Sequence, residues 1–91
     1  MRTFSRTTQF KKDVKLAGRR GKDLAKLKAV LDLLIVGDEL PEKYEDHPLR
    51  GNFMGSRDCH IESDWVLIYT IAENGSHVRF ERIGTHSDLF R

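Results

Sequence analysis

The chain has 91 residues, of which 38% are hydrophobic and 33% charged, with a formal net charge of +2, so one domain over residues 1–91 with a two-layer core is expected. Its longest apolar run, residues 33–36, is far shorter than the roughly 20 residues of a membrane-spanning helix, which argues against a membrane partner. The single cysteine, Cys59, excludes an internal disulfide and fits a reducing compartment, so we expect a cytoplasmic protein.

Hydrophobic periodicity predicts one short strand and two helices in the first 37 residues. Residues 1–7 form the strand candidate. Thr8 is a suitable cap for a helix over residues 8–18, and a second helix over residues 22–36 ends at Gly37. Each helix has one apolar face, so the helical hairpin requires a surface to cover.

The helical region is strongly basic. Between residues 2 and 28, only Asp13 and Asp23 oppose ten cationic side chains. These are Arg2, Arg6, Lys11, Lys12, Lys15, Arg19, Arg20, Lys22, Lys26 and Lys28. Such a distribution fits an anionic partner such as nucleic acid, and it also fits a solvated helix face.

Three strands are predicted after a polar connection over residues 38–52. Residues 53–61 and 77–83 alternate between apolar and polar, and residues 64–71 are nearly continuously apolar, as in a central strand buried on both faces. The resulting order, β-α-α-β-β-β, indicates an α+β fold. An antiparallel sheet is expected to carry the helical hairpin on one face and to leave the other face open for function.

Histidines are the most informative polar residues. His47 precedes the first of the three later strands, His60 lies late in that strand with Asp64 across the following turn, and His86 follows the last strand. Imidazole exchanges a proton near neutral pH, so these groups beside a basic surface are sufficient for RNA cleavage without a metal or another cofactor. His77, beside an Asn-Gly turn, is expected to lie elsewhere.

Two other interpretations of these residues stay open at this point. Each histidine could be an ordinary surface or hydrogen-bonded residue. The set of His47, His60, Asp64 and His86 could instead bind zinc, although the close ligand spacings typical of zinc sites are missing.

Three sequence segments resemble the YafQ-type toxins of the RelE/ParE superfamily. They are "DHPLRG" (46–51), "RDCHIESDW" (57–65) and "RFERIGTHSDLF" (79–90), which occur in the family's order and separations, and the resemblance extends over about residues 8–90. It implies a RelE-like fold and a ribosome-dependent endoribonuclease that cleaves mRNA in the ribosomal A site. The alternative within the superfamily is a non-catalytic, ParE-like toxin that binds DNA gyrase.

The resemblance also implies roles for individual residues. His47, His60, Asp64 and His86 match the family's catalytic positions, and Phe90 matches a position that holds RNA. We expect His86 to be the general acid, His60 or Asp64 the general base, and His47 a contact of the scissile phosphate. Further RNA-binding candidates, able to neutralise phosphate, are Arg50, Arg57 and Arg79.

The implied partners are the 70S ribosome with its mRNA and rRNA, and a cognate antitoxin. The antitoxin is expected to be a dimeric, DinJ-like DNA-binding protein that folds a disordered tail onto the toxin. Operator DNA would be contacted only through this antitoxin.

Overall fold

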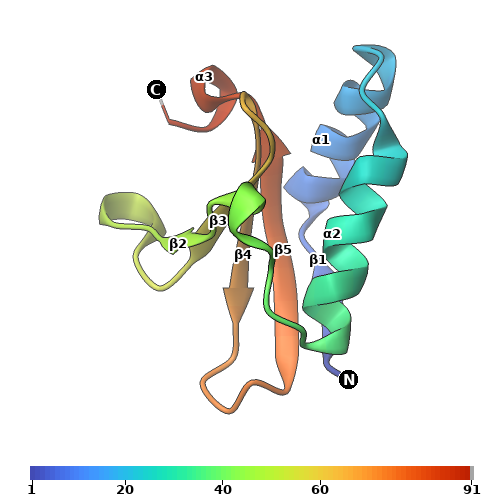
Figure 1. The fold of residues 1–91 in the computed structure, drawn as a ribbon. Coiled ribbons are helices and arrows are strands. Elements are labelled where there is room, and N and C mark those ends of the chain that lie inside the picture. The colour runs from blue at the N-terminus through green and yellow to red at the C-terminus, as the bar shows by residue number, and fades with distance from the viewer. Residues whose placement is uncertain (91) are drawn as a thin grey trace.

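A computed structural model describes residues 1–90, and Figure 1 shows their arrangement. Within this range the elements are β1 (Thr3–Arg6), α1 (Thr8–Arg19), α2 (Leu24–Val36), β2 (His47–Pro48), β3 (Arg57–Glu62), β4 (Trp65–Ile71), β5 (His77–Gly84) and α3 (His86–Leu89). Short 3-10 turns cover Glu42–Tyr44 and Gly51–Phe53. None of these helices is long and apolar enough to cross a lipid bilayer.

The strands of residues 1–90 form one five-stranded sheet in the order β1-β5-β4-β3-β2. Strands β3, β4 and β5 are the expected antiparallel meander, whereas β1 pairs with β5 in parallel. The α+β fold class is confirmed, with a mixed rather than an entirely antiparallel sheet. The parallel pair arises because α1 and α2 carry the chain across one face of the sheet after β1 (Figure 1).

Local capping explains where the two long helices begin and end. Thr7, one residue before the expected cap, accepts a hydrogen bond from the Phe10 amide at 2.9 Å and starts α1. Asp23 caps α2 through the Ala25 amide at 3.0 Å. Gly37 ends α2 with φ of 97°, a left-handed conformation in which glycine has no steric penalty.

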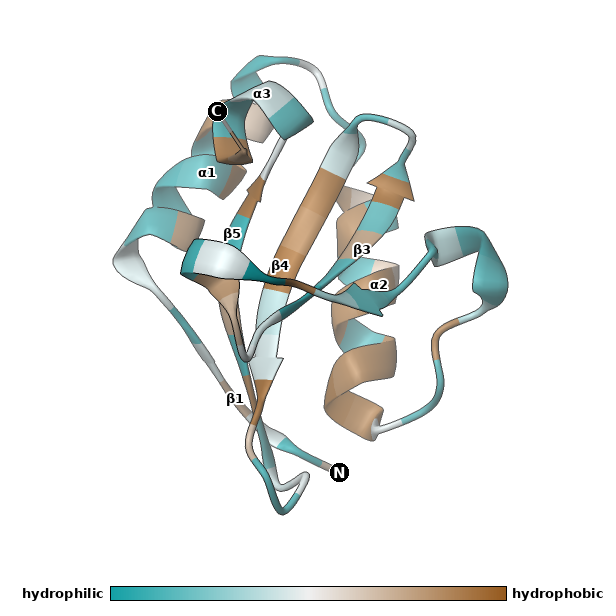
Figure 2. Cartoon of the chain, turned by 90° about the vertical axis from the view of Figure 1, so that its left-hand side faces the viewer, coloured by the Kyte–Doolittle hydropathy of each residue, from teal (hydrophilic) through white to brown (hydrophobic). Residues whose placement is uncertain are grey.

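Strand β4 is buried on both faces, as predicted, and separates two apolar clusters. On the helix side, Trp65, Leu67 and Tyr69 belong to the main core, which also includes residues of α1 and α2. On the other side, Val66 and Ile68 form a smaller cluster with Leu89 of α3, against which Leu49 and Phe53 pack. Figure 2 shows this second side, with α3 and the connection around β2 in front of the sheet.

A buried carboxylate joins α1 to β5. Asp13 accepts hydrogen bonds from the Arg82 guanidinium at 2.8 and 3.1 Å, from the Ile83 amide at 3.1 Å and from the Gln9 amide group at 3.0 Å. These contacts fix the helical layer relative to the strand that leads into α3.

The connection between α2 and β3 contains more structure than the sequence predicts. The strand expected from residue 53 begins at Arg57 because the preceding chain turns through Gly51–Phe53 and then through Gly55, whose φ is 92°. Upstream, His47 and Pro48 pair with Arg57 and Asp58 as the two-residue strand β2. This short pairing brings His47 to the face that the helices leave open.

Candidate active site

Three of the four histidines meet on the open face of the sheet. The ring centroids of His60 and His86 are 5.2 Å apart, and those of His47 and His60 are 6.3 Å apart. Strand β3 supplies His60, β2 supplies His47 and α3 supplies His86. The structure therefore brings together the three histidines expected to share a site. His77 lies on β5, where its ring bonds the hydroxyls of Thr3 and Ser5.

The Nδ1 atom of each clustered histidine faces an oxygen acceptor. In His86, Nδ1 lies 2.7 Å from a carboxylate oxygen of Asp64. In His60, Nδ1 lies 2.7 Å from a carboxylate oxygen of Glu45. In His47 it is 3.0 Å from the backbone carbonyl of Glu45. An ionised carboxylate or a carbonyl can only accept, so Nδ1 donates in each case and Nε2 is left for substrate.

Asp64 orients His86 through two contacts. Its Oδ1 atom accepts from the backbone amide of His86 at 2.9 Å as well as from the ring. The hydrogen bond from the His86 backbone amide, and after it the hydrogen bond from the His86 ring, hold the pKa of the Asp64 carboxyl below its ordinary value. A carboxylate with a lowered pKa is a weaker base, so this geometry favours His60 over Asp64 as the proton acceptor.

Glu45 contacts two histidines from a backbone conformation that is rare for glutamate. Its φ and ψ of 49° and 45° lie in the left-handed region, which costs a residue other than glycine about 1–2 kcal/mol. The turn aims the carbonyl at His47 and the carboxylate at His60. The sequence alone gave no indication of this residue, because its contribution depends on a backbone turn.

Asp58 is a second residue that the sequence analysis missed. It is 3% exposed and lies opposite His47 in the β2–β3 pair. Its Oδ1 atom is 3.0 Å from Nδ1 of His47 but has no hydrogen bond of good geometry, since that Nδ1 donates to Glu45. Burial raises the pKa of the Asp58 carboxyl, and all three clustered histidines oppose the increase. The sequence did hold a signal for Asp58: it precedes His60 by two residues in a strand, and residues with this spacing lie on the same face of the sheet.

Phe90 extends the histidine cluster along the open face. Its ring centroid is 6.1 Å from that of His86 and 5.8 Å from that of Phe53. The side chain is 39% exposed, so one part is supported by the protein while another is open to solvent. A supported, half-exposed aromatic ring beside ionisable groups is suited to stacking on a nucleic-acid base.

The three arginine candidates are not gathered around the histidines. Arg57 lies on the helix side of the sheet, where its guanidinium binds Asp46 at 3.0 Å and the same carboxylate accepts from the Tyr69 hydroxyl. Arg79 binds Glu81 at 2.7 Å. Arg50 is exposed in the connection after β2. Because Asp46 lies between Glu45 and His47, the Arg57–Asp46 contact is suited to fixing the connection that carries these two residues to the sheet.

The zinc interpretation finds no preformed ligand set. Among residues 1–90, no group of three or more histidine, cysteine, aspartate or glutamate side chains is arranged to hold a metal ion. In the cluster, the Nδ1 atoms are instead engaged by oxygen acceptors.

A mixed five-stranded sheet with two helices on one face is the RelE/YafQ-like architecture. Within that class, the chain belongs to the YafQ family: residues 2–91 match the family model described as "Bacterial toxin of type II toxin-antitoxin system, YafQ". This confirms the family suggested by the sequence motifs and the expectation of an endoribonuclease toxin.

Similar proteins support this membership. The "mRNA interferase toxin YafQ" of Escherichia coli strain K12 is 52% identical over 83 residues, which cover 90% of this chain and 88% of that protein. The crystal structure of YafQ from E. coli strain BL21(DE3) has a TM-score of 0.93 at 47% identity and full coverage of both chains. YafQ in a crystal structure of the E. coli DinJ-YafQ toxin-antitoxin complex has a TM-score of 0.91 at 48% identity, covering 99% and 98% of the chains.

Proposed function

We propose that this toxin cleaves mRNA in the ribosomal A site by acid–base catalysis through the ribose 2′-hydroxyl, and thereby inhibits translation. The observation that carries the proposal is the pair of His60 and His86. Their rings are 5.2 Å apart, and a different carboxylate engages Nδ1 of each. Two oriented imidazoles at this separation can act on the two ends of one phosphodiester linkage.

The proposed reaction uses one neutral imidazole and one protonated imidazole. Nε2 of His60 removes the 2′-hydroxyl proton, and O2′ attacks the adjacent phosphorus. The P–O5′ bond breaks as Nε2 of His86 gives a proton to the leaving oxygen. The products are a 2′,3′-cyclic phosphate and a 5′-hydroxyl, so atoms and charge balance without a redox partner.

The remaining site residues would hold the substrate. His47, beside buried Asp58, is placed to contact the scissile phosphate, and Phe90 to stack on a neighbouring base. Arg50 and Arg79 are the more accessible of the proposed phosphate contacts, since Arg57 binds Asp46 on the opposite side of the sheet.

The basic helical layer would bind the ribosome. Lys11, Lys12, Lys15 and Arg19 are exposed on α1, where an rRNA backbone could dock through phosphate contacts. Binding of this kind weakens steeply with salt because counterions are released. A cognate antitoxin, as in the DinJ-YafQ complexes of E. coli, would neutralise the toxin. We propose that this antitoxin is dimeric and that the toxin reaches operator DNA only through it.

Cleavage of a defined mRNA would test the proposal. The purified toxin is incubated with free mRNA and with ribosomes stalled at a known codon, with chelators selective for zinc and calcium present and magnesium retained. A parallel message carries a single 2′-deoxy nucleotide 5′ to the cut. We expect cleavage in the A-site codon only with ribosomes, a cyclic phosphate end, and no cut in the deoxy message or with His86→Ala.

Three results would overturn the proposal in different ways. Cleavage of the 2′-deoxy message would exclude attack by the 2′-hydroxyl, and equal cleavage of free mRNA would exclude the ribosome requirement. If mRNA stays intact while the protein inhibits DNA supercoiling by purified gyrase, the ParE-like alternative replaces the proposal.

A further inference from the structure

The helix that carries His86 is too short to hold its own position. Helix α3 contains four residues, and isolated helices of this length do not form in water. Its orientation must therefore come from contacts with the rest of the protein. If His86 donates a proton to RNA, as the proposed function requires, its placement depends on those contacts.

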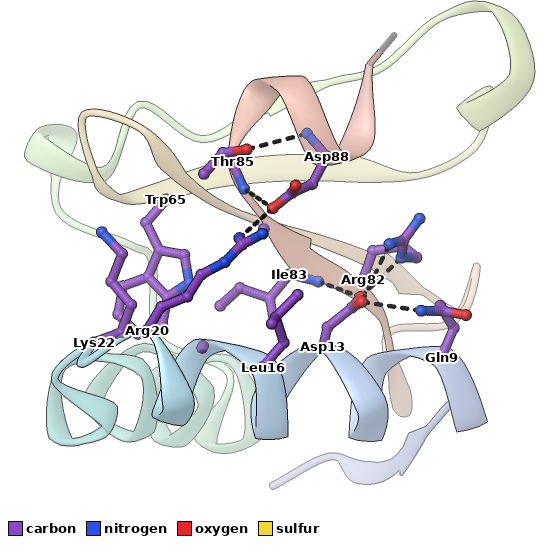
Figure 3. Close-up of a pocket in the computed structure, with 12 residues that line it drawn as sticks. Gln9, Asp13, Leu16, Arg20, Lys22, Trp65, Arg82, Ile83, Thr85 and Asp88 are labelled. Carbon is purple, nitrogen blue, oxygen red and sulfur yellow. Dashed lines mark hydrogen bonds and ion pairs between the residues drawn. The ribbon is translucent and has the colours of Figure 1, made fainter.

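Asp88 contributes to two contacts that fix α3. Within the helix, its carboxylate accepts from the Thr85 amide at 3.0 Å, while its own amide donates to the Thr85 hydroxyl at 3.0 Å, forming a capping box. Outside the helix, the same carboxylate binds the Arg20 guanidinium at 2.7 Å. Figure 3 shows these contacts above the cavity between α1 and β5.

The end of β5 approaches Asp88 closely, and the residue after Asp88 is buried. A Cβ atom added at Gly84 would lie 3.0 Å from both Cβ and Oδ2 of Asp88, so the end of β5 and this side chain are in close contact. Leu89, the next residue, is buried in the cluster with Val66 and Ile68. Helix α3 is thus held by an apolar contact on the open face and by a charged contact toward α1.

Arg20 lies at the end of α1, a helix whose position is fixed by other contacts. It is the C-terminal cap of α1, and its backbone amide donates to carbonyls of the last helical turn. Helix α1 is in turn fixed to β5 by the Asp13 carboxylate, which the Arg82 guanidinium and the Ile83 amide engage. Arg20 therefore presents its guanidinium to Asp88 from a position that does not depend on α3.

We infer that Arg20 is a positioning residue for His86, which it acts on through Asp88, two residues further along α3. The inference rests on the proposed function, in which His86 is the acid. Supporting it, Arg20 and then the Thr85 amide hold the pKa of the Asp88 carboxyl at about 2, so this partner is ionised throughout the neutral range.

Other roles for Arg20 make different predictions. If Arg20 instead bound RNA phosphate directly, its removal would raise KM in a salt-dependent manner. If the ion pair only stabilised the fold, its removal would lower the melting temperature and leave kcat unchanged. A positioning role lowers kcat at unchanged KM, because a small displacement of the acid misplaces the proton that it donates.

The test is a double-mutant cycle in steady-state cleavage of mRNA on stalled ribosomes. Its variants are Arg20→Ala, Asp88→Asn and the combination; asparagine keeps the oxygen that caps α3 but removes the charge. We expect each single variant to lower kcat roughly tenfold, and the double variant to lower it no further. Arg20→Lys should recover part of the rate. The matched control is Asp32→Asn, which removes the exposed Lys28–Asp32 pair, also 2.7 Å long, and should leave kcat unchanged.

A second measurement does not depend on cleavage. The His86 amide, bonded to Asp64 at 2.9 Å, and the Phe90 amide, bonded to the His86 carbonyl at 2.8 Å, report the order of α3 by hydrogen exchange. In Arg20→Ala they should exchange faster, relative to the amides of β4. Unchanged exchange, or kcat effects that multiply in the double variant, would overturn the inference. If the two amides exchange faster in Arg20→Ala but the wild-type protein cleaves no mRNA, only the proposed function is refuted.

Discussion

Replacing Asp13 by alanine should strongly destabilise the fold. The substitution removes the charged acceptor of two hydrogen bonds that the Arg82 guanidinium donates, at 2.8 and 3.1 Å, and it leaves the Ile83 amide without its partner. Bonds to charged groups contribute about 1.5–3 kcal/mol each, and an unpaired buried amide costs about 1–3 kcal/mol. Since the Arg82 side chain is 29% exposed, water compensates for part of its loss. A net loss of about 3–4 kcal/mol follows.

Urea unfolding followed by circular dichroism at pH 7 would measure this loss. For a chain of this size it corresponds to a fall in melting temperature of roughly 12–30 °C. Asp13→Asn keeps an acceptor for the Ile83 amide but loses the charge, so it should cost less than Asp13→Ala. The control is Asp32→Asn. It removes the exposed Lys28–Asp32 ion pair, which is expected to contribute about 0.5 kcal/mol or less. A loss below about 1 kcal/mol for Asp13→Ala would refute the idea that this carboxylate fixes α1 to β5.

Three further predictions concern the turn after α2, the α3 ion pair and the open face. Gly37→Ala should lower the free energy of unfolding by about 1–2 kcal/mol, because φ is 97° there, and an unchanged urea midpoint would contradict this. Because Arg20 holds the pKa of Asp88 at about 2, against an ordinary 3.8, the stability from this carboxylate is complete above pH 4 to 5 and is lost as pH falls toward 2. Asp88→Asn should therefore cost stability at pH 6 but not at pH 2 in urea titrations, and equal losses at both pH values would disprove the linkage. Phe90→Ala should raise KM for mRNA cleavage by at least about fivefold, with Phe90→Tyr close to wild type, if the ring stacks on a base; equal KM values would exclude stacking.

The parts of the fold that the sequence predicts are those with several turns or alternations of pattern. Helix α2 repeats its apolar spacing over thirteen residues, and β4 is apolar at every position except Thr70. Strand β2 has two residues and α3 four, which is too few for any periodicity to be recognised. For α3 a different signal was present, since Thr85 and Asp88 have the spacing of a capping box.

The candidate site was predictable where it depends on strand alternation or on family motifs. Alternation already places Arg57 and His60 on opposite faces of β3, and the structure agrees. Glu45 was not predictable, because its contacts with His47 and His60 require a left-handed turn that its residue type disfavours. The role of Arg20 was equally hidden, since its partner Asp88 is 68 residues away in the sequence.

The parallel pairing of β1 with β5 has a consequence for when the toxin first becomes active. Thr3 pairs with His77, which lies 74 residues later in the sequence. Strand β1 therefore cannot join the sheet until β5 has been synthesised. Long-range pairing of this kind makes folding slow. The histidine cluster is completed only by α3, which follows β5. The proposed action on translating ribosomes is therefore unavailable until the residues of β5 and α3 have been synthesised, and the proposed antitoxin has that interval in which to accumulate.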